Sequence, residues 1–344
     1  MLSDKNHKSI LMRPLERLSG LPSPYNLVEG LGCLYRESHG PSSRGVQLPY
    51  PPNEWTLNEG VTEETVLGFA GDILDTKGLP ATIEPDAREF FSNCDAVVAN
   101  FESIITSLPG HGTSVRHTPQ ILDTLERLFP PHSTYLSVAN NHAGDYPAEI
   151  LFDSVHLLEN RGFNVFGWND RPYTEIGKSI RVIGASDWSN APCDSVAMLD
   201  DTKTPVHIKQ GAFNILFPHW GYELELNPRR SMMRKAKAWV AKGFDAIIAH
   251  HGHTPRTIYA VETDTGAPRS LIADSLGDFV CGFAPAWYHF GMVVKAGIGR
   301  DHSGRLAIGK LHWEFCETKP VDGVVSTSLR KGLSPAKLAG LASG

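Results

Sequence analysis

The sequence has few features typical of a disulfide-rich, membrane-spanning or nucleic-acid-binding protein. Its five cysteines are scattered and form no Cys-x-x-Cys pair, which argues against a disulfide framework or a structural zinc knuckle. No run approaches the roughly 18 to 20 apolar residues of a membrane span. The N-terminus carries charge throughout, so no signal peptide is predicted, and we expect a cytoplasmic location. A formal net charge of −6 gives no reason to expect nucleic acid as a partner.

The 344 residues present, 41% of them hydrophobic, suffice for one large core with decorations or for two domains. Residues 1–64 are rich in Pro, Gly and Ser and lack a sustained periodicity, which predicts an irregular N-terminal extension. We expect the main domain at 65–318 and a C-terminal tail at 319–344. The sequence leaves open whether residues 1–64 cover a cleft, extend an interface or remain mobile. It does not predict an oligomeric state.

Short apolar runs bounded by polar or glycine-containing clusters predict buried strands. They lie at residues 65–70, 95–100, 134–139, 163–167, 179–185, 213–218, 244–249 and 269–274. Two later runs, 291–298 and 305–315, alternate more and predict a half-exposed antiparallel pair. Helices are predicted between several strands, at 118–129, 147–162 and 227–243. This alternation predicts an α/β layered architecture with a largely buried sheet.

Polar clusters follow the predicted strands directly. They contain Asp72, then Asn100 and Glu102, then Asn140, Asn141 and His142, then His219 and Trp220, and finally the three histidines of "HHGH" at 250–253. In α/β sheets, ligands bind in the crevice beyond the carboxyl ends of the strands. Five strand ends are therefore expected to bring carboxylates, an amide and imidazoles to one rim.

Most of these clusters also have an ordinary structural explanation when taken singly. Asp72 could be a turn or helix-cap residue, Glu102 a surface carboxylate and His142 a hydrogen-bonded core histidine. "HHGH" is hard to explain by packing and favours metal binding. Together the mixed oxygen and nitrogen donors suit Mn, Zn or Fe. Two such ions about 3.5 to 4 Å apart are a common arrangement for hydrolysing phosphate esters. We therefore expect two divalent transition metals, with the Asn141 amide oxygen on one of them.

Several motifs, in this order along the chain, resemble the CapA family of poly-γ-glutamate capsule biosynthesis proteins, a branch of the calcineurin-like metallophosphatase superfamily. They are "GFAGDI" (68–73), "VVANFES" (97–103), "VRHTPQILDTL" (115–125), "SVANNHAGDYPAEILFDSVHLLENRGFNVFG" (137–167), "FPHWGYELELNP" (217–228), "GFDAIIAHHGHTPRTIYAVE" (243–262) and "SLGDFV" (275–280). The resemblance covers roughly residues 65 to 300. It implies a layered metallophosphatase-like sandwich of mixed β-sheets flanked by helices.

The resemblance also implies roles for individual residues. The metal ligands would be Asp72, Glu102, Asn141, His219, His251 and His253. His142 would be the general acid, oriented by Asp145. The candidate substrate-binding residues are Arg116, Asn100, Trp220 and Glu223; the Arg116 guanidinium suits phosphate or carboxylate, and Asn100 is a competing metal ligand.

This chain departs from the superfamily pattern at two positions of its metal motifs. Leu74 stands where a histidine usually follows the first aspartate, so one metal site could be weaker or Asp75 could substitute. Glu102 replaces the usual aspartate of the second motif. The absence of an anchor segment argues for a soluble, intracellular substrate rather than a capsule role.

We expect a metal-dependent hydrolase that uses a metal-activated water on an anionic small molecule or polymer. A phosphoester is favoured, and a γ-glutamyl or other amide bond is the alternative. A second hypothesis is a metal-binding accessory protein of anionic polymer synthesis without turnover, as Leu74 suggests. A purely structural scaffold is a third, and it must treat the clustered strand ends as coincidence.

Overall fold

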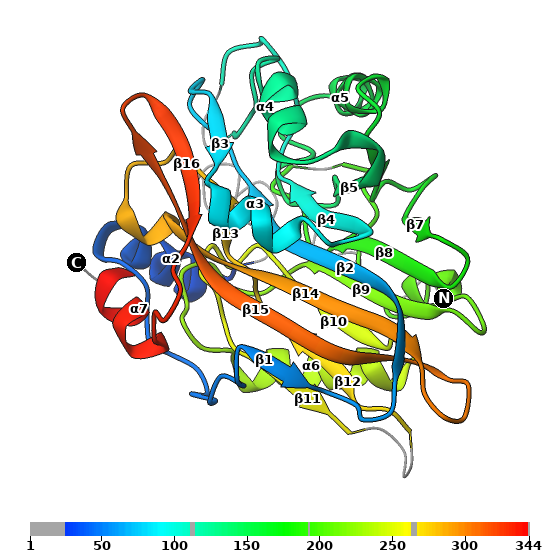
Figure 1. Cartoon of the computed structure of the whole chain (residues 1–344). Coiled ribbons are helices and arrows are strands. Elements are labelled where there is room, and N and C mark those ends of the chain that lie inside the picture. The colour runs from blue at the N-terminus through cyan, green and yellow to red at the C-terminus, as the bar shows by residue number, and fades with distance from the viewer. Residues whose placement is uncertain (1–24, 111–113, 192, 263–266, 343–344) are drawn as a thin grey trace, which may run out of the picture.

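Two β-sheets packed face to face, with helices on their outer sides, make up the fold (Figure 1). The computed structural model describes residues 25–110, 114–191, 193–262 and 267–342. Both sheets are mixed, and helices cover the outer face of each. The predicted fold class, a layered α/β sandwich of mixed sheets, is confirmed.

The first sheet holds ten of the strands found in the described residues. Its main path runs β3-β16-β15-β14-β2-β4-β5-β6, while β1 pairs with β15 and β13 with β2. The neighbours β2, β4, β5 and β6 are parallel, and β14 runs antiparallel to β2. The strands are β1 (Glu54–Thr56), β2 (Thr62–Ile73), β3 (Ala81–Ile83), β4 (Ala96–Phe101), β5 (Thr134–Ser137), β6 (Asn164–Phe166), β13 (Asp278–Val280), β14 (Phe290–Arg300), β15 (Leu306–Val321) and β16 (Val324–Leu329).

The second sheet holds six strands of the described chain, in the order β11-β12-β10-β9-β8-β7. Its four inner strands are parallel, and β7 and β11 are antiparallel edges. The strands are β7 (Tyr173–Ile176), β8 (Ile180–Ser186), β9 (Phe213–His219), β10 (Ala246–Ile248), β11 (Ile258–Val261) and β12 (Ser270–Ala273).

The helices lie outside this pair of sheets. They are α2 (Leu27–His39), α3 (Pro85–Phe91), α4 (Ile121–Leu128), α5 (Ala148–Asn160), α6 (Arg230–Ala241) and α7 (Pro335–Ala342), with short 3₁₀ turns η1 (Pro131–Ser133), η2 (Thr204–His207) and η3 (Ala286–Tyr288). No helix in the described part of the chain is long and apolar enough to cross a membrane.

Alternation along the strands divides the core into three layers. In β4, Val97 and Ala99 pack against α3, α4 and α5, whereas Ala96 and Val98 face the second sheet. In β9, Leu216 packs against α6, while its neighbours point back between the sheets. Successive side chains of a strand point to opposite faces, so a strand buried on both sides must be apolar throughout. This explains the continuous apolar runs of the sequence.

Two segments differ from the prediction. Helix α2 lies inside residues 1–64, which were expected to be irregular. It forms because Asn26 caps its first turn and because its buried residues pack on the rest of the chain. The described part of the expected tail, residues 319–342, is also structured, since β15 continues to Val321, β16 pairs with it and α7 follows. All five cysteines are free thiols; Cys33, Cys281 and Cys316 are buried, and Cys94 and Cys193 are partly buried.

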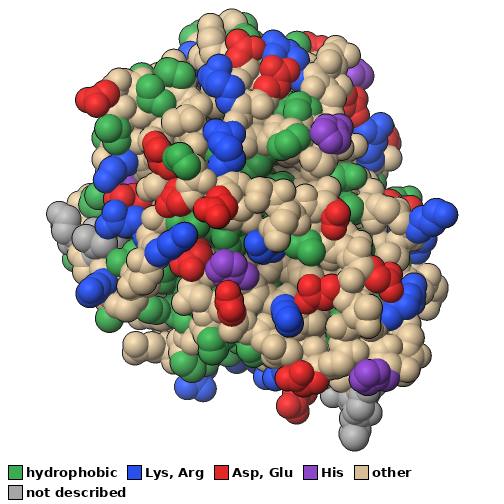
Figure 2. Space-filling model, in the orientation of Figure 1, with side chains coloured by type: hydrophobic (Ala, Val, Ile, Leu, Met, Phe, Trp, Pro, Cys, Tyr) green, Lys and Arg blue, Asp and Glu red, His purple; other side chains and the backbone are tan. Residues whose placement is uncertain are grey.

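The surface is electrostatically mixed. On the face drawn in Figure 2, acidic and basic side chains are interspersed, with no extended patch of one sign. This agrees with the modest net charge of −6. A group of acidic and histidine side chains, in contrast, is buried inside the molecule.

Candidate metal centre

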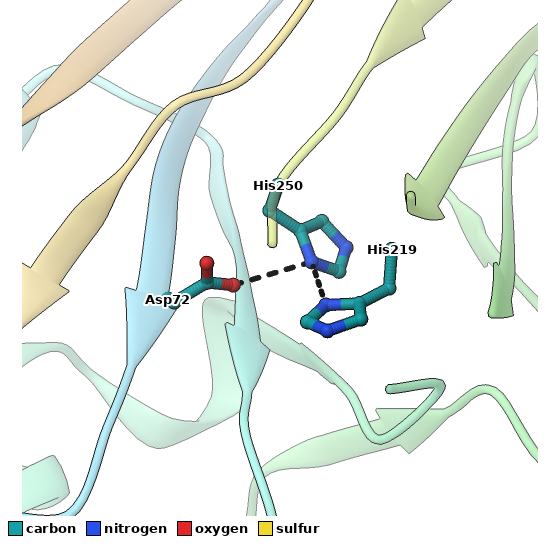
Figure 3. Close-up of side chains that lie close together, drawn as sticks. All are labelled: Asp72, His219 and His250. Atoms are coloured by element: carbon teal, nitrogen blue, oxygen red, sulfur yellow. Dashed lines mark hydrogen bonds and ion pairs between the residues drawn. The ribbon is translucent and has the colours of Figure 1, made fainter. Parts of the chain in front are cut away.

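Five of the six predicted ligands lie at the ends of four central strands, two in each sheet, and the sixth, Asn141, follows β5. Asp72 is the penultimate residue of β2, and Glu102 directly follows β4. His219 ends β9, and a single parallel bridge pairs it with His250, just beyond β10. Figure 3 shows Asp72, His219 and His250 converging from three different segments. The expectation that distant strand ends converge is therefore confirmed by the geometry.

Two groups of possible ligands share Glu102. One combines it with His219 and His251, the other with Asp72 and His253, and within each group the ligand atoms lie within 4.8 Å of one another. Glu102 Oε1 lies 3.7 Å from His219 Nε2 and 4.0 Å from His253 Nε2. These separations are too long for hydrogen bonds. Two ligands about 2.1 Å from one tetrahedral ion would be about 3.4 Å apart, so the spacing is close to what an ion needs.

Buried polar atoms without a hydrogen-bond partner indicate whether a cation would fit here. Both carboxylate oxygens of Glu102 and both ring nitrogens of His251 are buried without a hydrogen-bond partner in the described chain. Such groups cost free energy unless something compensates them, and oxygen and imidazole donors together suit transition metals. The residues present therefore fit a metal centre.

The electrostatics of Glu102, His219 and His251 point the same way. His253 differs, because burial lowers its pKa but the charges of Asp278 and Glu102 raise it well above the ordinary value. Burial, and then the charge of Asp72, raises the pKa of Glu102 well above its usual range. Burial, and then the neighbouring histidines, lowers the pKa of His219 and His251 well below the ordinary value. These imidazoles are therefore neutral, with a lone pair for a metal. A cation would stabilise Glu102 as the carboxylate in a site where carboxylates otherwise repel one another.

The candidate general acid lies at the edge of this cluster. His142 Nδ1 is 2.6 Å from Asp145 Oδ2, and its Nε2 lies 3.9 Å from Glu102 Oε1. Asp145 also accepts a hydrogen bond from the backbone N–H of Val115, which fixes the carboxylate. The side chain of His142 retains 12% of its surface, whereas Glu102 retains none. The predicted His142–Asp145 pair is thus present and faces both the cluster and solvent.

The three neighbouring asparagines are placed differently. Asn141 Oδ1 lies 2.7 Å from His219 Nε2, beside the cluster as expected for a ligand. Asn140 accepts from the Ser103 N–H and donates to the Phe101 carbonyl, which makes it a structural link between loops. Asn100 Nδ2 donates to Asp72 Oδ1 at 2.7 Å, so its nitrogen, not its oxygen, faces the aspartate. This orientation gives Asn100 the task of holding Asp72.

Three residues with predicted or suggested roles have other contacts. The ring of Trp220 has no exposed surface and packs against α6 with Met232 and Ala236, so no described contact supports substrate binding. Arg116 donates to the Thr106 carbonyl. Asp75, suggested as a substitute ligand, instead accepts from both the backbone and the side chain of Lys77. Asp75 belongs to none of the metal-type groups in the described residues.

Glu223, predicted to bind substrate, belongs to a group with His251 and His253. Two further acidic or imidazole side chains were not assigned roles from the sequence. His250 lies 3.2 Å from Asp72 Oδ1 and 2.8 Å from His219 Nδ1 (Figure 3). Asp278, directly opposite Asp72 in the β2–β13 pairing, accepts from His253 Nδ1 at 2.8 Å. Such carboxylates orient metal-binding histidines.

The backbone around these residues is strained. Ser103, His251 and His253 have positive φ angles of 87°, 90° and 50°. Non-glycine residues rarely adopt this region, and such strain concentrates at functional sites. Here it turns His251 and His253 towards Glu102 from a loop that follows a very short strand.

The sequence is similar to those of known proteins. Residues 66–282 match the family described as bacterial capsule synthesis protein PGA_cap. The PGA biosynthesis protein CapA of Bacillus subtilis (strain 168) is 24% identical over 289 residues, which cover 74% of this chain and 73% of that protein. The capsule biosynthesis protein CapA of Bacillus anthracis is 23% identical over 227 residues, or 58% of this chain and 53% of that protein. The chain therefore belongs to the PGA_cap family of capsule synthesis proteins, which has a metallophosphatase-like fold.

Proposed function

We propose that this protein is a metal-dependent hydrolase of an anionic substrate, with a phosphoester as the favoured bond and a γ-glutamyl amide as the alternative. The observation that supports it best is the pair of donor groups sharing Glu102, whose two oxygens have no other partner in the described residues. Asp72, Glu102 and His253 would hold one ion, and Glu102, Asn141, His219 and His251 the other. When bound, divalent ions polarise the scissile group and lower the pKa of water.

The chain itself would supply proton transfer and orientation. Asp145 accepts from His142 Nδ1, so the other ring nitrogen, Nε2, faces the cluster and would carry the transferable proton in the imidazolium form. A general acid at this edge can protonate the leaving oxygen or nitrogen. Asp278 fixes the ring of His253 and Asn100 fixes Asp72, so the donors are positioned before any substrate arrives.

The substrate class follows from the relatives and the chemistry. The two similar proteins are named for PGA and capsule biosynthesis. We propose a role in the metabolism of an anionic polymer of this kind, with the polymer or its anionic precursor as substrate. A cytoplasmic location, predicted from the sequence, is part of this proposal.

Metal analysis of the purified protein tests the first step. We expect bound Mn, Zn or Fe, near two equivalents, and a loss of most of it in the double variant His251→Ala/His253→Ala. His156→Ala is the control, because this histidine is 72% exposed on α5 and lies in no donor group of the described chain. Equal metal content in the double variant and in the wild type would contradict the proposal.

The second candidate is a metal-binding accessory protein without turnover. Two observations favour it. None of the candidate ligand residues in the cluster is more than 5% exposed apart from Glu223, and Leu74 packs among Val115, Leu224 and Tyr288 instead of offering a donor. Assays with aryl phosphate, aryl phosphodiester and γ-glutamyl anilide substrates discriminate between the two. A metal-loaded protein inactive on all three, and on poly-γ-glutamate itself, would favour the accessory role.

A further inference from the structure

Helix α2, which lies outside the stretch matched by the family, is fastened to one residue at the edge of the metal centre. Arg36 Nε donates to the Glu223 carbonyl at 2.7 Å, and the Glu223 N–H donates to the Tyr25 hydroxyl at 2.9 Å. The Cys33 thiol lies 3.0 Å from Glu223 Oε2. Both the backbone and the side chain of Glu223 are therefore held by the N-terminal segment.

These contacts create a separate group of metal-type donors. The Cys33 sulfur, a Glu37 oxygen and a Glu223 oxygen all lie within 4.8 Å of one another. Cys33 is 3% exposed and Glu223 8%, so both are shielded from water, while Glu37 is half-buried. Cys33 and Glu37 occupy i and i+4 of the same helix and so project from one face of it towards Glu223.

An unpaired buried imidazole faces this group. His251 is fully buried, and its Nε2 lies 3.6 Å from Glu223 Oε1, beyond hydrogen-bond distance. Neither of its ring nitrogens has a hydrogen-bond partner among the described residues. The hydrogen bond from the Cys33 thiol to Glu223 Oε2 explains that contact, and His251, a candidate ligand of the central cluster, lies at the edge that the two groups share through Glu223.

We propose that Cys33, Glu37 and Glu223 form a further metal site for a thiophilic divalent ion such as Zn²⁺, next to the central cluster and linked to it through Glu223. A thiolate among carboxylates selects Zn²⁺ or Co²⁺ over Mg²⁺ and Ca²⁺. Binding breaks the S–H bond, forms a sulfur–metal bond and releases the proton to solvent. The ion would tie helix α2 to the loop that carries Glu223. The site does not depend on hydrolysis by the central cluster.

Titration of the metal-free full chain with Co²⁺ tests this assignment, because a thiolate ligand gives an intense sulfur-to-cobalt charge-transfer absorption. We expect the band in the wild type and its loss in Cys33→Ser, together with one equivalent of bound metal. Cys94→Ser is the matched control, since this thiol lies near Phe91 and Gly68, away from the group. We expect it to keep both the band and the stoichiometry.

Two more variants separate this site from the central cluster. Glu37→Gln removes a ligand charge from a half-buried position and should weaken the cobalt–thiolate site by at least about tenfold while leaving the fold intact. His219→Ala should reduce the metal held by the central cluster but keep the charge-transfer band. Absence of the band in the wild type, or a band that survives Cys33→Ser, would overturn the assignment. Failure of the central cluster to bind metal would not affect this result.

Discussion

Glu102 is the single residue on which the two donor groups depend. Its carboxylate is fully buried, and no described side chain donates a hydrogen bond to it. An uncompensated buried charge destabilises a fold, whereas the same charge against a cation stabilises it. Glu102 should therefore destabilise the folded protein without metal and stabilise it when metal is bound.

Replacing Glu102 by Gln should reveal that reversal. In EDTA we expect Glu102→Gln to be more stable than the wild type by about 1 to 3 kcal/mol, and so to unfold at a higher denaturant concentration, because burying a carboxyl group whose pKa is raised costs free energy at neutral pH. With saturating Mn²⁺ the order should invert, since the variant has lost the shared ligand. Denaturant unfolding under both conditions measures the effect. The same order in both would mean that Glu102 does not bind the ions.

The His142–Asp145 pair gives a second residue-scale prediction. His142→Ala should lower kcat by about a hundred- to ten-thousandfold, because the proton donor to the leaving group is missing, while metal content stays unchanged. Asp145→Asn should lower it less, since it only weakens the orientation of the ring. Steady-state kinetics with metal analysis on the same samples checks both. Full activity of His142→Ala would remove the role assigned to this histidine.

At the scale of elements, strands β2 and β13 approach closely beside Asp72. A β-carbon added to Gly71 would lie 1.9 Å from the Gly277 carbonyl oxygen, the same atom that accepts from the Asp72 N–H at 2.9 Å. Only glycine permits this approach. The position of Asp72 thus depends on the small residue before it.

Gly71→Ala should therefore destabilise the protein by about 1 to 3 kcal/mol or more and weaken metal binding at the same time. Gly340→Ala in α7 is the control, because nothing lies within 4 Å of the β-carbon it would add. Thermal unfolding and metal content are the two measurements. A variant as stable as the control would show that β2 and β13 can separate at no cost.

The junction between α6 and the parallel strands β9 and β10 should respond to pH. Burial raises the pKa of Asp245 to about 6, although the Asn214 N–H donates to its carboxylate at 2.7 Å. The folded state therefore binds this proton more tightly than the unfolded state, whose carboxyl has a pKa near 3.8. Stability from this group is lowest above pH 6 and increases as the pH falls towards 4.

Relative to Asp245→Asn, the wild type should gain stability between pH 7.5 and about 4.5. Asp301→Asn is the control: hydrogen bonds from Ser303 lower the Asp301 pKa to about 2, so its difference from the wild type should stay nearly constant over that range. Urea unfolding across the pH series measures both differences. A flat difference for Asp245 would indicate that water reaches its carboxylate.

The elements also show where sequence reasoning succeeded. Every run predicted as a strand is one, and the continuous apolar runs mark strands buried on both faces, as in β4 and β9. The runs at 291–298 and 305–315 form the predicted antiparallel pair, but β14 is buried along nearly its whole length and is not half-exposed. Helix α2 was not predicted, because its sequence contains two glycines and its larger apolar residues, among them Leu31 and Leu34, point to solvent. Its stability comes from contacts with Glu223, far away in the sequence.

The site was predictable to a similar extent. Polar residues directly after apolar runs identified Asp72, Glu102, His219 and the "HHGH" loop, because strand ends converge in layered α/β folds. Asp278 could not be placed, since its role depends on the pairing of β13 with β2, and β13 is only three residues long. Cys33 and Glu37 reach the site through helix α2, whose docking no local pattern shows.

At the scale of the whole molecule, metal should control global stability. At a free metal concentration about one hundred times the Kd, binding to the folded state alone adds about 2.7 kcal/mol. We expect chelation to lower the midpoint of thermal unfolding of the wild type, and addition of Mn²⁺ or Zn²⁺ to restore it. In His219→Ala the midpoint should depend much less on metal. Equal sensitivity in both proteins would show that the stabilising ions bind elsewhere.

The candidate ligands lie in or just after strands of two separate sheets, among them β2 and β4 in one and β9 and β10 in the other. An ion held there would link the two sheets of the sandwich. The same few side chains would then contribute both to the reaction and to the stability of the fold. Inactive variants at these positions would be of two kinds: those that lose only the reaction and those that also weaken the packing of the two sheets. Activity and unfolding must therefore be measured on the same sample to tell the two kinds apart.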